Sequence, residues 1–410
     1  MSNTVLNIFT IDFPYGNGEP FLKNEIEILS KKFETIFVYP LNFKDTSIKY
    51  DLPPNIIVKH EDIFSPYNRL AVLSKNIFLI SSIFISEITS SGFGKYYISN
   101  FRRHFNILLH RINAANSLSN SFKKKAQPHL VYTYWFTQWT LIFSIVNRKQ
   151  KNIDLFTRIH GMDVYEDQHT EKNFFFPFRI FQEKQIKKVI AISENGKQHL
   201  IKMAPQFKDK VVVNRLGVIH HNLNPINTNN EFVLVSCSSF QKYKRVNLIA
   251  EILKNINFKI KWIHFGDSEE RRTVVDGFKN IPSNVSIELR GFISSKELME
   301  FYKNHPVDLF INVSETEGIP VSIMEAMSFG IPCIATNVGG VSEIVNASNG
   351  LLVKKDLDIK EVAAFITNYR ARPEEVPNYR SNAQITWRKK YNIEENTKQL
   401  ANILINSKAA

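Results

Sequence analysis

Two carboxylates mark the segment that is best equipped for chemistry, SETEGIPVSIMEAMSFGIPCIATNVGGVSEIV, residues 314–345. Glu317 and Glu325 stand eight residues apart in it, around a Gly-Ile-Pro turn. Because an ionised carboxylate accepts hydrogen bonds from two neighbouring hydroxyls, such residues suit hydroxyl-rich ligands. Glu317 falls in a predicted loop and Glu325 about one turn into a predicted helix. We therefore expect them to reach different parts of one ligand.

Predicted helix starts follow both glycine-containing turns of this segment. One helix is predicted over residues 321–329, after Gly318 and Pro320, and a shorter one after Gly339 and Gly340. Glycine lets the backbone approach a ligand closely, and a helix amino end presents free N–H groups and partial positive charge. Such groups suit a diphosphate held without a metal ion. A diphosphate joined to two hydroxyl-bearing groups describes a nucleotide sugar.

The rest of the chain alternates apolar strands with helices. It opens strand, turn, helix, strand (TVLNIFTID, FPYGNGEP, FLKNEIEILSKKF, ETIFVYPL), which is a βαβ unit and predicts a parallel sheet. An irregular stretch rich in Asn, Pro and His, residues 217–232, precedes a second alternating series. The 410 residues exceed what one core usually holds. We predict an α/β protein with two Rossmann-like, doubly wound domains that bind ligands at the carboxyl ends of their strands, across a cleft.

Composition excludes several other classes of protein. Cys237 and Cys333 both lie in apolar runs, so buried thiols are expected rather than a disulfide framework or a metal site. The best candidate for a membrane span, residues 70–88, is interrupted by Lys75 and Glu87. Its uncharged part of 11 residues is shorter than the roughly 20 that a span requires. With no signal-peptide pattern at residues 1–13, we expect a cytoplasmic protein.

The formal charge of +13 is unevenly distributed, because residues 88–153 contain ten Lys and Arg and no Asp or Glu. Aromatic residues are interleaved with the cations. A solvated basic face and a surface for anionic lipid headgroups both fit this pattern. Nucleic acid fits less well, because no nucleic-acid-binding motif accompanies the charge. The lipid alternative predicts a peripheral protein on the inner membrane face, with these membrane-contacting residues: Arg102, Arg103, Lys123, Lys124 and Lys125.

The segment that begins at Glu315 resembles the E-x7-E region of retaining glycosyltransferases of glycosyltransferase family 4, which have the GT-B fold. Other pieces follow in the family's order: FPYGNGEPFLKNEI, YTYWF, RIHGMDVY, NRLGV, SCSSFQKYKRVNLI, HFGDSEE and LRGFISSKEL. The resemblance is to enzymes of bacterial surface-polysaccharide synthesis. It implies an acceptor-binding domain over residues 1–217, completed by a C-terminal helix over 388–410, and a donor-binding domain over 218–387.

The implied reaction transfers a sugar, with retention of configuration, from a UDP- or GDP-linked donor to a glycan or lipid-linked acceptor. No cofactor or metal is expected. A nucleotide-sugar epimerase, which would turn over the donor without an acceptor, is an alternative of the same fold. A non-catalytic glycan- or lipid-binding scaffold is an alternative from another class. A phosphorylase is expected to carry a pyridoxal lysine, for which we find no motif.

The resemblance also assigns roles to residues of the donor domain. Glu317 would contact the donor sugar and Glu325 the ribose, while Lys244 would neutralise the diphosphate as it leaves. Backbone contacts to the donor are expected from Gly318, Ile319, Pro320, Gly339 and Gly340. The chain departs from the family at Ser239, where many relatives carry a second phosphate-binding Arg. Lys242 is a candidate replacement.

In the first domain, the resemblance places His160 near the transferred sugar and the acceptor, as a catalytic and acceptor-binding residue. A purely structural histidine is the alternative. Asp163 is assigned to the acceptor side and is expected to cap or orient its loop. Gly16 and Gly18 would lie near the donor diphosphate or the acceptor, although a plain tight turn also explains them.

Overall fold

The computed structural model describes residues 2–16, 19, 21–43, 50–61, 63–90, 94–123, 127–165 and 177–406. It divides into two compact units, Met1–Asn214 with Thr397–Ala410, and Arg215–Asn396. The sequence predicts these boundaries at 217/218 and 387/388. The chain therefore returns to the first unit later than predicted, within the helix α15 (Ile393–Asn406).

The N-terminal unit is built on a seven-stranded parallel sheet with the strand order β3-β2-β1-β4-β5-β6-β7. Its strands are β1 (Ser2–Thr10), β2 (Phe33–Pro40), β3 (Ile56–Val58), β4 (His129–Thr133), β5 (Ile153–Ile159), β6 (Ile186–Ala191) and β7 (Val211–Val213). Its helices before α15 are α1 (Leu22–Ser30), α2 (Arg69–Ser90), α3 (Gly94–Ser99), α4 (Phe101–Ser121), α5 (Gln138–Gln150), α6 (Gly161–Val164), α7 (Arg179–Glu183), α8 (Glu194–Met203) and η2 (Pro205–Phe207).

The central strands of this sheet are buried on both faces, which is why they read as apolar runs. All seven residues of β5 are buried. One face packs into a core with α2, α4 and α5, and the other packs against α1 and the end of α15 through Leu400, Ala401 and Leu404. The last helix of the chain therefore completes the core of the first unit.

The C-terminal unit carries a six-stranded parallel sheet with the order β10-β9-β8-β11-β12-β13. The strands are β8 (Phe232–Cys237), β9 (Ile260–Phe265), β10 (Val285–Leu289), β11 (Leu309–Asn312), β12 (Cys333–Thr336) and β13 (Gly350–Val353). The helical elements are η3 (Lys242–Lys244), α9 (Val246–Leu253), α10 (Arg271–Val275), α11 (Ser295–Asn304), α12 (Val321–Ser328), η4 (Val341–Glu343), α13 (Ile359–Ala371) and α14 (Val376–Lys390).

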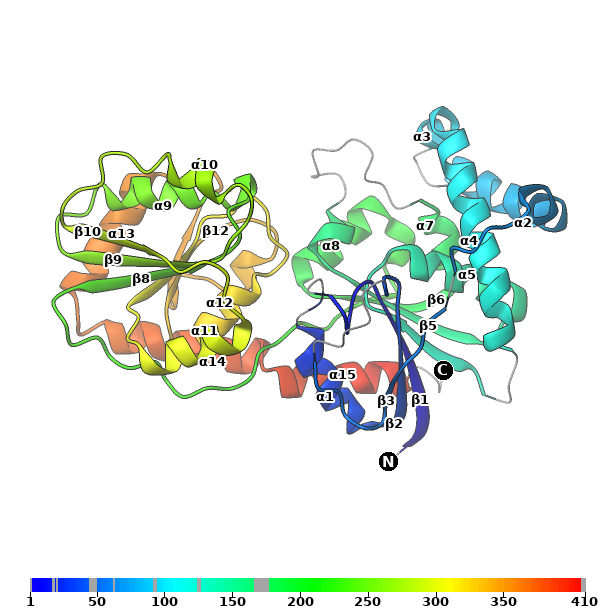
Figure 1. Ribbon diagram of the computed structural model, residues 1–410, viewed down its shortest axis with the longest axis horizontal. Coiled ribbons are helices and arrows are strands. Elements are labelled where there is room, and N and C mark those ends of the chain that lie inside the picture. The colour runs from blue at the N-terminus through cyan, green and yellow to red at the C-terminus, as the bar shows by residue number, and fades with distance from the viewer. Residues whose placement is uncertain are drawn as a thin grey trace. The chain divides into compact units, whose positions relative to one another are not determined.

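Helices cover both faces of this second sheet, with α9 and α13 on one face and α11, α12 and α14 on the other (Figure 1). The strand order reverses between β8 and β11, so the chain winds outward in both directions from that pair. Such a switch point leaves room at the carboxyl ends of the two strands, where ligands bind in doubly wound sheets. The equivalent pair in the first unit is β1 and β4.

One described helix, residues Arg69–Thr89 within α2, has the length and the mean hydropathy (1.5) to cross a membrane. By this measure α2 is long enough to span, whereas the sequence predicted an apolar run that is too short. A third of its apolar window (33%) is nevertheless buried in the folded unit. Val72, Ile80, Ile83 and Phe84 belong to the core, so α2 is an integral part of the domain.

Candidate active site

Lys244 and Glu317, both assigned to donor binding in the sequence analysis, meet at the carboxyl ends of β8 and β11. Lys244 Nζ donates to Glu317 Oε1 at 2.7 Å, and Asn312 Nδ2 lies 3.3 Å from the same oxygen. Both side chains are largely buried. Little water screens the pair. A ligand group that replaces one of the two side chains would therefore interact strongly with the charge of the other.

The neighbouring Arg245 explains why the two loops approach each other. Its backbone is left-handed (φ 50°), and its guanidinium turns toward β11. It donates to the carbonyls of Val313 (2.6 Å), Ser314 (3.3 Å) and Lys355 (2.8 Å). Arg245 thus fastens the loop after β8 to the end of β11 and keeps Lys244 beside Glu317. The sequence did not reveal this role.

The backbone of Glu317 packs directly against Gly339. A Cβ at Gly339 would lie 1.8 Å from the Glu317 carbonyl oxygen, and the residue has a positive φ of 53°. The Gly340 N–H donates to the Gly318 carbonyl at 2.7 Å. That N–H is used inside the protein, and the predicted second helix is only the three-residue 3₁₀ turn η4. A helical turn thus begins where the sequence predicted a short helix, although it is only one 3₁₀ turn long.

The turn before α12 is ordered by packing. Ile319 is buried, and Pro320 directly precedes the first residue of α12, Val321. Further along the helix, Glu325 is buried and accepts a hydrogen bond from Ser295 Oγ at 2.7 Å. Burial raises the pKa of Glu325 to about 7, against the opposing effect of that hydrogen bond. Ser295 is a partner that sequence spacing could not show.

Ser239, which the resemblance led us to compare with a phosphate-binding Arg, belongs to a neutral group. Its hydroxyl lies 3.2 Å from Gln241 Oε1, which also accepts from the Tyr243 hydroxyl at 2.6 Å. Lys242 is exposed in η3. Lys244 is therefore the cation that the structure holds against Glu317.

In the N-terminal unit, the loop after β1 is organised by Glu19, to which the sequence analysis gave no role. Its buried carboxylate accepts backbone N–H groups of Ile11 (2.8 Å), Asp12 (2.9 Å) and Phe13 (2.7 Å). It also accepts from Trp135 Nε1 at 2.8 Å, so it ties the ends of β1 and β4 together. Burial raises the pKa of Glu19, although these four hydrogen bonds act in the opposite direction.

The predicted glycine turn lies in this loop. Gly16 N–H donates to the Asp12 carbonyl at 3.0 Å, and a Cβ at Gly16 would lie 2.4 Å from Asp12 Cβ. A tight turn is thus the observed role of Gly16. Gly18 lies outside the described residues.

His160 is buried beside the end of β4. Its Nε2 lies 3.0 Å from the Tyr134 carbonyl, which can only accept, so Nε2 carries the ring proton. Burial, followed by the charge of Arg158, lowers the pKa of His160 to about 3. The ring of Trp135 lies 4.3 Å from that of His160. At neutral pH His160 is therefore an uncharged imidazole.

Asp163 orients the loop that carries His160. One carboxylate oxygen accepts the Phe136 N–H at 2.8 Å, and the other accepts the backbone N–H of His160. Asp163 is buried. This matches the capping role expected from the sequence and directs its carboxylate toward the protein backbone.

The predicted membrane-contacting cations are spread along α4. Arg102 and Arg103 are exposed in its first turn, and Lys123 is exposed just beyond its end. Since α4 has 21 residues, about 30 Å separates the two groups. Lys124 and Lys125 lie outside the described residues.

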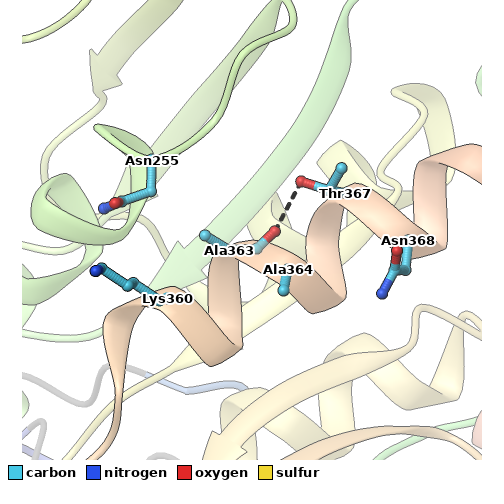
Figure 2. A pocket seen from close by; sticks show the side chains of 6 residues that line it. All are labelled: Asn255, Lys360, Ala363, Ala364, Thr367 and Asn368. Atoms are coloured by element: carbon cyan, nitrogen blue, oxygen red, sulfur yellow. Dashed lines mark hydrogen bonds between the residues drawn. The ribbon is translucent and has the colours of Figure 1, made fainter.

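A hollow of about 340 Å³ lies beside α13, apart from these residues (Figure 2). Its lining is small and polar: Asn255, Lys360, Ala363, Ala364, Thr367 and Asn368. Thr367 Oγ1 donates to the Ala363 carbonyl at 2.9 Å within the helix. None of the predicted site residues lines this hollow, and we assign it no role.

Residues 221–386 match the family model described as "Glycosyl transferases group 1". An uncharacterized glycosyltransferase, MJ1178, of Methanocaldococcus jannaschii is 30% identical over 223 residues, which are 52% of this chain and 59% of that protein. The N-acetyl-alpha-D-glucosaminyl L-malate synthase of Bacillus anthracis is 32% identical over 28% of this chain and 30% of that one. The matches thus span less than two thirds of these relatives.

Solved structures match over nearly the whole chain. The lipopolysaccharide outer core galactosyltransferase WaaB has a TM-score of 0.68 at 16% identity, with 99% of both chains covered. Anabaena HepE in complex with UDP has a TM-score of 0.68 at 17% identity, with 98% of this chain and 100% of that one covered. Together with the two parallel α/β sheets, these likenesses show that the protein has the GT-B fold.

Proposed function

We propose that the protein is a retaining glycosyltransferase of family 4, which transfers a sugar from a nucleotide donor to a glycan or lipid-linked acceptor in cell-surface polysaccharide synthesis. The observation that carries the proposal is the pairing of Lys244 with Glu317 at 2.7 Å. The pair lies at the switch point of the C-terminal sheet, inside the segment that matches group 1 glycosyltransferases.

In the proposed reaction, the Lys244 ammonium leaves the Glu317 carboxylate and pairs with the donor diphosphate. The ammonium then neutralises the negative charge that develops on the departing phosphate. Glu317 is left to accept hydrogen bonds from sugar hydroxyls. The bond between the anomeric carbon and the phosphate oxygen breaks, and the acceptor oxygen bonds to the same face. The acceptor proton passes to the leaving phosphate, so configuration is retained.

We propose that the N-terminal unit binds the acceptor around His160. With the ring proton on Nε2 directed to Tyr134, Nδ1 is the acceptor nitrogen. Nδ1 accepts from the Asp163 backbone N–H in the capping box that begins α6. A neutral His160 would therefore shape the acceptor site by its position and would not supply a proton. Asp163 fixes the backbone from which the ring projects.

We favour UDP over GDP as the nucleotide. Support comes from the likeness to HepE, which has been solved with UDP and with UDP-glucose. A UDP-N-acetylglucosamine-dependent peptide glycosyltransferase subunit, GtfA of Streptococcus parasanguinis, is also 23% identical over 48% of this chain. We further propose that transfer needs no metal, since Lys244 supplies the cation at the diphosphate.

A panel of UDP- and GDP-sugars tests the proposal in two stages. A donor at 100 times its dissociation constant should stabilise the fold by about 2.7 kcal/mol, which thermal melting detects. The stabilising donor is then incubated with candidate acceptors and EDTA, and the anomeric configuration of the product is read by NMR. Failure of every nucleotide sugar to bind would refute the proposal. An inverted product would refute retention, and loss of transfer in EDTA would refute metal independence.

A further inference from the structure

One side of α2 exposes large apolar side chains along most of its length. Leu70, Ile77, Phe78 and Ile85 are 77%, 44%, 88% and 62% exposed. Ile77 and Phe78 are neighbours, and Ile85 follows about two turns later with serines between them, so these three share one stripe of the helix beyond its kink at Asn76. Leu70 lies before the kink. A soluble protein rarely exposes so many large apolar side chains on one side of a helix without a use for them.

The opposite side of α2 is fixed in the N-terminal unit. Val72, Ile80, Ile83 and Phe84 pack into the core. Asn76, where the helix kinks, accepts from Lys149 Nζ of α5 at 2.9 Å. To cross a membrane, α2 would have to leave this core. Its exposed stripe is therefore suited to lie along an interface instead.

The apolar surface continues onto α3 and the start of α4. Ile98 is 63% and Phe101 48% exposed, and the Phe101 ring lies 4.9 Å from that of Phe84 in α2. Figure 1 shows the three helices together at one edge of the N-terminal unit. We define the docking face by six residues: Leu70, Ile77, Phe78, Ile85, Ile98 and Phe101.

The charges around the docking face are of one sign. Exposed cations occur on all three helices, at Lys75, Lys95 and Arg102. Between residues 69 and 121 the sequence contains a single carboxylate, Glu87, which is 1% exposed. It accepts from the Tyr97 hydroxyl (3.1 Å) and the Phe181 N–H (2.8 Å) inside the unit. An anionic partner meets no exposed negative charge from these helices.

We propose that the docking face inserts shallowly into an anionic lipid bilayer, with α2 lying in the interface and the cations contacting headgroups. The combination of apolar insertion and basic flanks favours a bilayer over a protein partner, because a protein face would need matching side chains at every cation. The sequence expectation of a membrane-contacting α4 is thereby extended to α2, which supplies most of the apolar area.

Vesicle sedimentation with the full chain tests this without donor or acceptor, so its outcome is independent of the proposed reaction. Wild type is compared on phosphatidylcholine vesicles and on vesicles that also contain phosphatidylglycerol, at low and high salt. The apolar variant is Phe78→Ser/Ile85→Ser, and its control is Ile226→Ser, which removes a 74% exposed side chain from the C-terminal unit. The charge variant is Lys95→Gln/Arg102→Gln, with Lys279→Gln/Lys389→Gln as its control.

We expect wild type to prefer anionic vesicles and to keep part of its binding at high salt, since the apolar contribution is not screened. The apolar variant should lose at least about tenfold in partitioning and all of its high-salt binding. The charge variant should lose binding mainly at low salt, and both controls should match wild type. Absence of wild-type binding, or wild-type binding by the apolar variant, would overturn the proposal. A dimer that the apolar variant abolishes, without vesicle binding, would assign the face to a second copy.

Discussion

At the residue scale, Lys244 and Glu317 form an ion pair with each other, and each is also proposed to bind a group of the donor. Their 2.7 Å contact and shared burial mean that neither charge is left uncompensated in the protein alone. A nucleotide sugar would offer phosphate to one and hydroxyls to the other. Lys244 would then keep an anionic partner, and Glu317 would keep hydrogen-bond donors.

This exchange predicts that Glu317→Gln changes UDP binding and turnover to different extents. UDP affinity should stay within about threefold of wild type, because Lys244 remains available for the diphosphate. The turnover number should fall by about 100-fold or more, since sugar contacts that strengthen in the transition state are lost. Calorimetry with UDP and initial rates with the donor measure the two effects.

Lys244→Met serves as the matched variant, because it should lose both UDP affinity and rate. If Glu317→Gln weakened UDP binding as much as it slowed turnover, Glu317 would belong to the nucleotide and not to the sugar.

Glu325 predicts a pH dependence, because burial raises its pKa from 4.5 to about 7. Ribose hydroxyls donate to the ionised carboxylate, so binding should lower the pKa and release a proton. UDP affinity should then increase roughly tenfold between about pH 6 and pH 8. Calorimetry across this range measures it. Glu325→Gln should lose this increase, so that only the titration of the UDP phosphate changes its affinity with pH. An equal dependence of UDP affinity on pH in both proteins would contradict the ribose assignment.

The same shift has a consequence for stability. A carboxyl whose pKa is raised by folding contributes stability below about pH 4.5, and this contribution is lost as the pH rises through about 7. Without ligand, Glu325→Gln should therefore melt higher than wild type at about pH 8, and this advantage should shrink toward about pH 5.

At the element scale, the loops that follow β1 and β4 are held together by one carboxylate. Glu19 accepts three backbone N–H groups and the Trp135 indole, so the path of the loop depends on a single side chain. The His160 ring lies 4.3 Å from that of Trp135. The shape of the proposed acceptor site therefore rests on Glu19.

Glu19→Gln should loosen this loop, because an amide has only one acceptor atom and no charge. The loss of charge-assisted hydrogen bonds should cost about 1.5–3 kcal/mol in the free energy of unfolding. Trp135 should report the change by altered fluorescence, and the KM for the acceptor should increase while UDP affinity stays constant. An unaltered emission spectrum and an unaltered KM would show that Glu19 does not hold these loops in place.

The alternation of strands and helices could be predicted because buried parallel strands are apolar throughout and the helices between them are periodic. Glu317 could be placed at a ligand-binding edge because it follows a predicted strand, whereas Lys244 was assigned to the donor site only through the family resemblance. Arg245, Ser295 and Glu19 could not be assigned partners. Their contacts join residues 68, 30 and 116 positions apart, and such approaches depend on tertiary packing.

At the scale of the whole molecule, the chain leaves the first unit after Asn214 and returns to it at Thr397. The two crossings run side by side, since the Val218 N–H donates to the Tyr391 carbonyl at 3.0 Å. Gly217 allows this approach, because a Cβ there would lie 2.6 Å from the Ile393 backbone nitrogen. The first residues of α15 thus belong to the C-terminal unit, and its later residues pack in the N-terminal core.

This arrangement predicts that the last helix stabilises one unit and not the other. Leu400 and Leu404 are fully buried in a core formed with α1 and the strands of the first sheet. Leu400→Ala should cost about 2–5 kcal/mol, because it leaves a cavity there. Hydrogen exchange should quicken in α1, β1 and β2, while exchange in β8 and β11 and the affinity for UDP stay as in wild type. Ile403, only partly buried beside the same core, gives a milder control, Ile403→Ala. Uniformly faster exchange in both sheets would mean that the two units unfold as one, and α15 would then stabilise the molecule as a whole.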